Sequence, residues 1–276
     1  MTIDSGILAG KRGLILGVAN NRSIAWGIAK AVADHGAKLG LTYQGDALRK
    51  RVEPLAATLD ADVFGHLDVT DPASMDAVFD RVKQEWGGLD FIVHAIAFSD
   101  KNELTGRFID TSADNFHKSL AISCYSFVDI ARRAEPLMNE GGSMLTLTYY
   151  GAEKVMPHYN VMGVAKAALE ASVRYLAADL GPRGIRVNAL SAGPIKTLAA
   201  SGIGDFRYIL KWNEYNAPMR RTVTIEEVGS AASYLVSPMS SAVTGEVHHA
   251  DSGYHVVGMK AVDAPDITKA VAEDKS

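Results

Sequence analysis

Cysteine is almost absent from this sequence, whose 276 residues include only Cys124. A disulfide within the chain is therefore impossible, and we expect Cys124 to be a small packed side chain. This composition fits a reducing compartment. Long apolar segments are also lacking, because no run reaches the roughly 18 apolar residues that cross a bilayer. Residues 1–6 lack the pattern of a secretory signal peptide, so we expect a cytoplasmic protein with no membrane association.

Basic residues show no excess. There are 28 lysines and arginines against 32 acidic residues, which gives a net charge of −4 at pH 7. Such a chain has little positive charge to neutralise phosphates, and we expect no nucleic-acid partner. Hydrophobic residues make up 47% and charged residues 22%, which is typical of a globular protein and excludes disorder of the whole chain.

Short apolar runs alternate with longer helical patterns. This alternation predicts βαβ units and a parallel sheet. We expect strands at 13–16, 39–43, 63–66, 91–95, 144–148, 185–190 and 246–249. We expect helices at 24–35, 46–59, 72–86, 114–134, 159–180, 206–216 and 225–236.

No linker rich in Pro, Gly or Ser divides these elements, and no repeat is visible. The predicted fold is therefore α/β, a Rossmann-type doubly wound parallel sheet of about seven strands. We assign residues 1–260 to a single dinucleotide-binding catalytic domain. Residues 261–276 are expected to form a polar, loosely ordered C-terminal tail.

The turn after the first strand has the composition of a phosphate-binding loop. Gly17 permits a sharp turn, and Ser23 can cap the next helix or bind phosphate. The N-terminus of that helix offers free N–H groups to a pyrophosphate, while Gly27 allows close packing on the sheet. The spacing departs from the strict G-x-G-x-x-G fingerprint. A plain strand–turn–helix junction therefore remains an alternative for this motif taken alone.

Two further positions favour a dinucleotide. Gln44 follows the second predicted strand, where Rossmann proteins contact the adenosine ribose. It is neither the carboxylate typical of NAD enzymes nor the arginine typical of NADP enzymes, and we favour NADH with NADPH left open. Asp68 and Val69 follow the third strand and can hold an adenine edge. A helix-capping role is the alternative for Asp68.

Tyr159 and Lys166 are the strongest candidates for chemistry. They are seven residues apart, which is two helical turns, so both lie on one helix face. We expect the lysine to lower the pKa of the tyrosine and to hold ribose hydroxyls. Tyr159 can then donate a hydrogen bond to an oxygen that becomes anionic. Because Tyr and Lys are common on helix faces, ordinary surface residues are the alternative.

Several stretches together resemble one enzyme family. They are Leu41-Thr42-Tyr43-Gln44, His94-Ala95-Ile96-Ala97-Phe98, Tyr159-Asn160-Val161-Met162-Gly163, residues 192–199, residues 220–223 and residues 251–254. From about residue 8 to residue 259 the chain resembles the short-chain dehydrogenase/reductase superfamily, and within it the bacterial enoyl-acyl-carrier-protein reductases of the FabI type. The general superfamily has Tyr-x3-Lys, whereas Gly163 stands at that lysine position here. The longer Tyr-x6-Lys spacing is similar to the enoyl reductase branch.

The resemblance implies an activity: reduction by NADH of the trans-2 double bond of enoyl thioesters in bacterial fatty-acid synthesis. Hydride would pass to the β-carbon, and Tyr159 would stabilise the enolate oxygen. Lys166 would bind the nicotinamide ribose, and Tyr149, ten residues before Tyr159, would line the acyl pocket and assist catalysis.

The implied contacts follow from the same matching positions. The cofactor contacts are Gly17, Ser23, Ile24, Gln44, Asp68, Val69, Ala95, Ile96, Lys166, Ile195 and Thr197. The substrate contacts are Ala97, Tyr149, Met162, Ala199, Ile203 and Phe206, with residues 193–209 as a mobile lid. No metal site is predicted. Core packing is the alternative for the apolar members of this set.

The resemblance also implies acyl carrier protein as the partner that bears the enoyl chain, and a homotetramer built through the long helices and the last strand. Around residues 204–211 the family often shows several basic residues, whereas this chain has only Arg207 and Lys211.

Two rival functions remain: a related dehydrogenase acting on a ketone or alcohol, and a non-catalytic NAD-binding regulator. The ketone enzyme predicts Tyr-x3-Lys, and the regulator has no need of Tyr159 and Lys166.

Overall fold

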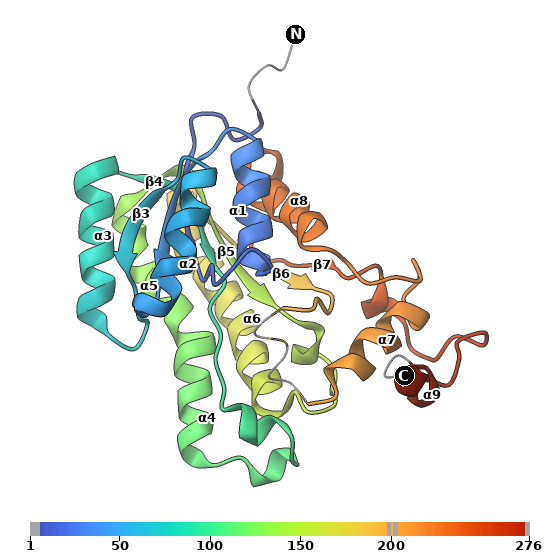
Figure 1. The fold of residues 1–276 in the computed structure, drawn as a ribbon. Helices are drawn as coiled ribbons and strands as arrows, with labels where there is room; N and C mark the ends of the chain where they lie inside the picture. Colours follow the sequence, from blue (N-terminus) through green and yellow to red (C-terminus); the bar gives the residue numbers. More distant parts are fainter. Residues whose placement is uncertain (1–5, 198–199, 201–203, 274–276) are drawn as a thin grey trace.

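The computed structural model describes residues 6–197, 200 and 204–273. Within these residues, seven strands form one sheet in the order β3-β2-β1-β4-β5-β6-β7, and all neighbouring strands are parallel (Figure 1). The strands are β1 (Arg12–Leu16), β2 (Lys38–Tyr43), β3 (Asp62–His66), β4 (Leu89–His94), β5 (Met138–Thr148), β6 (Arg186–Ala192) and β7 (Val247–Ala250). The predicted doubly wound α/β fold is confirmed.

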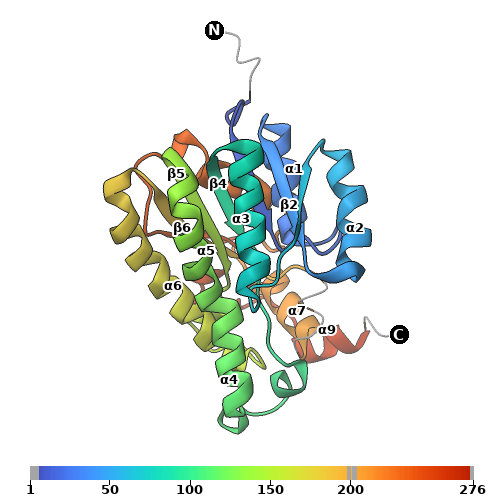
Figure 2. The same cartoon turned by 90° about the vertical axis from the view of Figure 1, so that its left-hand side faces the viewer.

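Helices cover both faces of the sheet (Figures 1 and 2). The core clusters place α1, α2 and α8 on one face and α3, α5 and α6 on the other. The α-helices are α1 (Ile24–Asp34), α2 (Gly45–Thr58), α3 (Pro72–Trp86), α4 (Ala113–Leu120), α5 (Ser126–Ala134), α6 (Asn160–Leu180), α7 (Phe206–Asn216), α8 (Ile225–Val236) and α9 (Ile267–Glu273). None of the described helices is long and apolar enough to cross a membrane.

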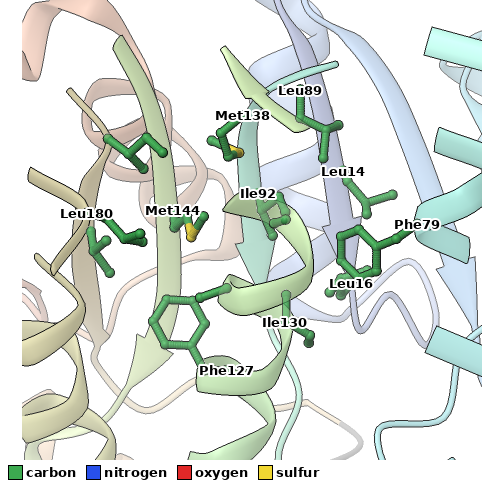
Figure 3. Close-up of a cluster of buried hydrophobic side chains, with 14 of the residues drawn as sticks. Leu14, Leu16, Phe79, Leu89, Ile92, Phe127, Ile130, Met138, Met144 and Leu180 are labelled. Carbon is green, nitrogen blue, oxygen red and sulfur yellow. The ribbon is translucent and has the colours of Figure 1, made fainter. Parts of the chain in front are cut away.

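The two cores follow from the alternation of side chains along each strand. Leu14 and Leu16 of β1 join the cluster under α3, α5 and α6, whereas Ile15 joins the cluster under α1, α2 and α8. Figure 3 shows the first cluster, to which Phe127 of α5 and Met144 of β5 belong. Burial on both faces explains why these strands read as continuous apolar runs.

The helix expected at 114–134 is interrupted. A π-helical segment, Ala121–Tyr125, separates α4 from α5. The hydroxyl of Ser126 donates to the carbonyl oxygen of Ile122 at 2.6 Å and bonds Nε2 of His94 at 2.9 Å. These bonds stabilise the wide turn and tie it to the end of β4. The prediction of a regular helix over this range is therefore wrong at its centre.

The C-terminal segment is more ordered than expected. The backbone N–H of Ala261 donates to Oδ1 of Asn216 at 2.8 Å, and Asp263 pairs with Arg220 at 2.9 Å. The helix α9 then packs on α7, and its Ile267 is 3% exposed. The prediction of a loosely ordered tail is therefore wrong for 261–273, because a hydrogen bond, an ion pair and the buried side chain of Ile267 together anchor this polar segment.

Candidate active site

A cavity of about 370 Å³ opens at the carboxyl ends of the strands. After β1 the chain continues into α1 on one face of the sheet, and after the adjacent β4 it continues into helices on the other face. Open α/β folds bind ligands at the point where two neighbouring strands diverge in this way. The described residues that line it are Gly17, Ala19, Ser23, Ile24, Ala25, Ala95, Ile96, Ala97, Phe98, Ser99, Lys101, Leu104, Leu147, Thr148, Tyr149, Tyr159, Met162, Lys166, Ala192, Gly193, Pro194, Ile195, Thr197, Ala200 and Phe206. Most of the predicted site residues are therefore brought together in one cavity.

The turn after β1 has room only for glycine. Gly17 has φ of +99°, and a Cβ there would lie 2.2 Å from the carbonyl oxygen of Ala95. This close approach joins the ends of β1 and β4 at the cavity floor. Ser23 precedes α1 without capping it, because its hydroxyl donates to the carbonyl oxygen of Asn20 at 2.7 Å. The first N–H groups of α1 therefore have no side-chain cap, as an anion site requires.

Gln44 and Asp68 lie outside the cavity lining but adjacent to each other. The amide Nε2 of Gln44 donates to Oδ2 of Asp68 at 2.8 Å, which links the ends of β2 and β3. Burial opposes ionisation of Asp68, but hydrogen bonds from Thr70 and Gln44 lower its pKa overall. Val69 is half-buried against the core. Two of the three predicted adenosine contacts are thus joined, and Val69 follows them, at the ends of β2 and β3, the two strands on one side of β1 in the sheet.

The two tyrosines predicted for catalysis are in contact. Their ring centroids are 5.1 Å apart with an interplanar angle of 81°. Tyr149 extends from the end of β5, and Tyr159 immediately precedes α6. The hydroxyl of Tyr149 is buried and has no hydrogen-bond partner among the described residues. A buried phenol without a partner is costly, so this group is suited to a polar ligand atom in the cavity.

The expected effect of Lys166 on Tyr159 is wrong. Burial first, and then Tyr149 and Glu170, raise the pKa of Tyr159 above its ordinary value. The ammonium of Lys166 donates instead to the carbonyl oxygen of Leu147 at 2.8 Å. Desolvation disfavours the phenolate and is the largest influence on this pKa. Tyr159 is therefore a neutral hydrogen-bond donor.

Lys166 itself is almost completely buried in the wall of the cavity. Burial lowers its pKa to about 8, so at neutral pH it is still mainly an ammonium group. Tyr159, just before α6, and Lys166, within it, both line the cavity, as their seven-residue spacing predicted. Gly163, between them, fits closely, since a Cβ there would lie 2.8 Å from the carbonyl oxygen of Gly151. A lysine at that position would require the backbone to move.

The predicted substrate contacts are partly located. Ala97, Met162 and Phe206 line the cavity together with Tyr149. Ala199 and Ile203 lie outside the described residues. The predicted lid ends in α7, which begins at Phe206, and its mobility stays a prediction.

Several lining residues were not predicted. Phe98 and Ser99 lie in the segment after β4, and Lys101 and Leu104 begin and end the 3₁₀ turn that comes next. Thr148 ends β5. All of these residues follow or end a strand, so the general rule that ligands bind beyond the carboxyl ends of strands could have predicted them.

Comparisons with known proteins agree on one family. A family model described as Enoyl-(Acyl carrier protein) reductase matches residues 17–255. The chain is 75% identical over 268 residues to enoyl-(acyl-carrier-protein) reductase (NADH) 1 of Rhizobium meliloti, covering 97% of this chain and 98% of that protein. A crystal structure of such a reductase from Anaplasma phagocytophilum in complex with NAD is 61% identical, with a TM-score of 0.90 and coverage of 94% and 98%. The Bacillus cereus reductase with NADP+ and indole naphthyridinone is 52% identical, with a TM-score of 0.90 and coverage of 92% and 100%.

Proposed function

Because the chain belongs to the enoyl-(acyl carrier protein) reductase family, we propose that it uses NADH to reduce the trans-2 double bond of enoyl thioesters in bacterial fatty-acid synthesis. One observation carries this proposal. A single cavity joins the glycine turn and the start of α1 to the phenols of Tyr149 and Tyr159 and the ammonium of Lys166. A cofactor site and a group that stabilises negative charge are thus adjacent.

The residues present fit a nicotinamide dinucleotide. The lack of space for a Cβ at Gly17 and the uncapped start of α1 at Ser23 and Ile24 suit a pyrophosphate. Gln44 and Asp68 would contact the adenosine end. The other cofactor contacts that we propose are Val69, Ala95, Ile96, Lys166, Ile195 and Thr197. When bound, the cofactor supplies the hydride for the β-carbon of the substrate.

Tyr159 is the group that stabilises the negative charge produced by hydride transfer. As electrons move from the double bond, negative charge develops on the thioester oxygen, and a preorganised donor stabilises it. A neutral phenol with a raised pKa keeps its proton and donates a hydrogen bond without forming phenolate. The enolate then gives the saturated thioester by taking a proton from solvent at its α-carbon. Tyr149, whose hydroxyl lacks a partner, lies beside it and assists in holding the thioester.

Lys166 contributes position and charge. Its ammonium has three N–H donors, of which one is used by the carbonyl oxygen of Leu147. The remaining donors are available to the ribose hydroxyls. Its positive charge in a buried wall also favours the developing enolate.

The rest of the cavity suits an acyl chain. Ala97, Met162 and Phe206, with Phe98 and Leu104, supply apolar surface. We include Ala199 and Ile203 as proposed contacts from the sequence. Apolar pockets with a few fixed polar groups are typical of small-molecule sites.

Acyl carrier protein is the proposed partner, and a homotetramer the proposed assembly, in the cytoplasm. The last strand, β7, is an edge of the sheet in this chain. Tyr125, at the end of the π-helical segment, and Tyr175 of α6 are 60% and 77% exposed. An unpaired strand edge and exposed aromatic residues support contacts between copies of the chain.

The rival functions make opposite predictions. Purified protein is mixed with NADH or NADPH and either a crotonyl or an acetoacetyl thioester, and absorbance is followed at 340 nm. Loss of absorbance with the crotonyl substrate is expected, and faster loss with NADH. Loss with the keto substrate alone would identify a ketone reductase. NADH binding without turnover of either substrate would identify a regulator.

A further inference from the structure

A buried carboxyl group lies one helical turn beyond the cavity lysine. Glu170 follows Lys166 by four residues on α6, so the two side chains are neighbours on one helix face. Both residues are more than nine-tenths buried. Glu170 is not among the described residues that line the cavity, so it acts on the site only through another group.

Two consecutive residues at the end of β5 hold this pair. Nζ of Lys166 donates to the carbonyl oxygen of Leu147 at 2.8 Å. The hydroxyl of the next residue, Thr148, donates to Oε1 of Glu170 at 2.6 Å. The strand end therefore fixes both the ammonium and the carboxylate relative to the cavity.

The charges around Lys166 come from several elements. Burial is the main influence and lowers its pKa, while Cys124 of the π-helical segment and Glu170 oppose that effect. His94 of β4 is completely enclosed, and burial, with the charge of Lys166, lowers its pKa to about 3. It is therefore neutral at working pH. Tyr159, on the same helix side, is a neutral phenol. Glu170 is thus the carboxylate that opposes the cost of burying the ammonium.

Glu170 has its own charged neighbours. Burial raises its pKa most, and Glu153 adds to that effect. His249 and Arg174 act in the opposite direction, as does the hydrogen bond from Thr148. His249 also contacts Glu153 at 3.1 Å. His249 lies on β7 and Arg174 lies one helical turn further along α6, so charged groups from two elements act on the carboxylate.

We propose that Glu170 is a positioning residue that keeps Lys166 protonated in the cavity wall, and thereby sets the alkaline limit of NADH binding and of turnover. The effect on turnover rests on the proposed function, whereas the effect on NADH binding does not. Removing the carboxylate leaves the buried lysine with one fewer group that opposes the effect of burial. Its proton is then lost at lower pH.

The first test is Glu170→Gln, which keeps an oxygen acceptor for Thr148 but removes the charge. NADH affinity is measured by fluorescence titration from pH 6 to pH 10, with kcat and KM measured in parallel. We expect the alkaline loss of NADH affinity to move to lower pH by about one unit, while affinity at pH 6 stays within about twofold. We call this loss of NADH affinity at high pH the alkaline limb. An alkaline limb at the same pH in Glu170→Gln as in the wild type would overturn the proposal.

Two matched variants separate charge from structure. Glu170→Asp retains a carboxylate and should restore most of the alkaline limb. Glu153→Gln removes a half-exposed carboxylate from the same cluster and should leave the limb where it is in the wild type. An equal shift in Glu153→Gln would mean that any nearby charge has this effect, which contradicts a specific role for Glu170.

Lys166→Arg keeps the test decisive if Glu170→Gln does not fold. A guanidinium remains charged throughout this pH range, so the alkaline limb of NADH binding should disappear. A limb that persists in Lys166→Arg would show that another group titrates, and the proposal would fail. Absence of enoyl turnover in the wild type would refute the proposed function and leave this binding test intact.

Discussion

The contact between α1 and α8 gives a quantitative prediction, because two glycines face each other across it. A Cβ on Gly27 would lie 2.4 Å from the carbonyl oxygen of Ile225 and 2.7 Å from its Cβ. A Cβ on Gly229 would lie 2.6 Å from the carbonyl oxygen of Gly27. The helices therefore touch through their backbones, and no side-chain rotation can relieve a clash at either position.

Gly27→Ala has two opposing effects. Alanine favours a helix over glycine by about 1 kcal/mol. Overpacking costs about 1–3 kcal/mol, and the upper part of that range applies because the backbone of Ile225 must move. We expect a net loss of about 1–2 kcal/mol in the free energy of unfolding. For a chain of this size, the melting temperature should fall by roughly 2–8 °C.

The same change should weaken cofactor binding. Moving α1 displaces Ser23 and Ile24, which line the cavity at the start of the helix. A helix N-terminus contributes about 0.3–2 kcal/mol to an anion, so loss of about 1 kcal/mol should raise the Kd for NADH roughly fivefold. Thermal unfolding at fixed protein concentration and fluorescence titration with NADH measure the two effects.

Gly181→Ala is the matched control. Gly181 has φ of −53°, and no atom lies within 4 Å of a Cβ built there. This variant should gain about 0.4–1 kcal/mol and bind NADH like the wild type. A melting temperature for Gly27→Ala at or above that of the wild type would refute the close helix contact.

Three further results follow from the cavity residues. Lys166→Ala should weaken NADH binding in a calorimetric titration and reduce turnover together; near-normal values for both would remove its proposed role. Tyr159→Phe should lower kcat by about 100-fold with NADH affinity within about twofold, and an unchanged rate and pH profile would exclude the phenol as donor. Because burial raises the pKa of Tyr159, the difference in absorbance at 295 nm between wild type and Tyr159→Phe should show no tyrosinate below about pH 10.

The sheet was predictable because its strands are buried on both faces and separated by helices. Runs such as 13–16 and 91–95 are apolar at every position or nearly so, which is what a central parallel strand requires. The π-helical segment was not predictable in this way. Its wide turn is stabilised by the buried contact of Ser126 with His94, which joins residues 32 positions apart.

The cavity residues also divide into those that a local sequence pattern predicts and those that it does not. Gly17, Tyr159 and Lys166 were predicted because they stand at sharp turns or at helical spacing. Phe98 and Lys101 were missed because the segment after β4 has no periodicity. The sign of the pKa shift of Tyr159 was wrong because spacing along a helix gives adjacency but not burial, and burial has the larger effect here.

The most direct test of the central claim follows two hydrogen atoms. Crotonyl thioester is reduced with NADH carrying deuterium at both C4 positions, and separately with unlabelled NADH in D₂O, and the butyryl product is examined by NMR. The account predicts deuterium at the β-carbon only in the first experiment and at the α-carbon only in the second. Deuterium from the cofactor at any other position, or no saturated product, would contradict the proposed hydride transfer.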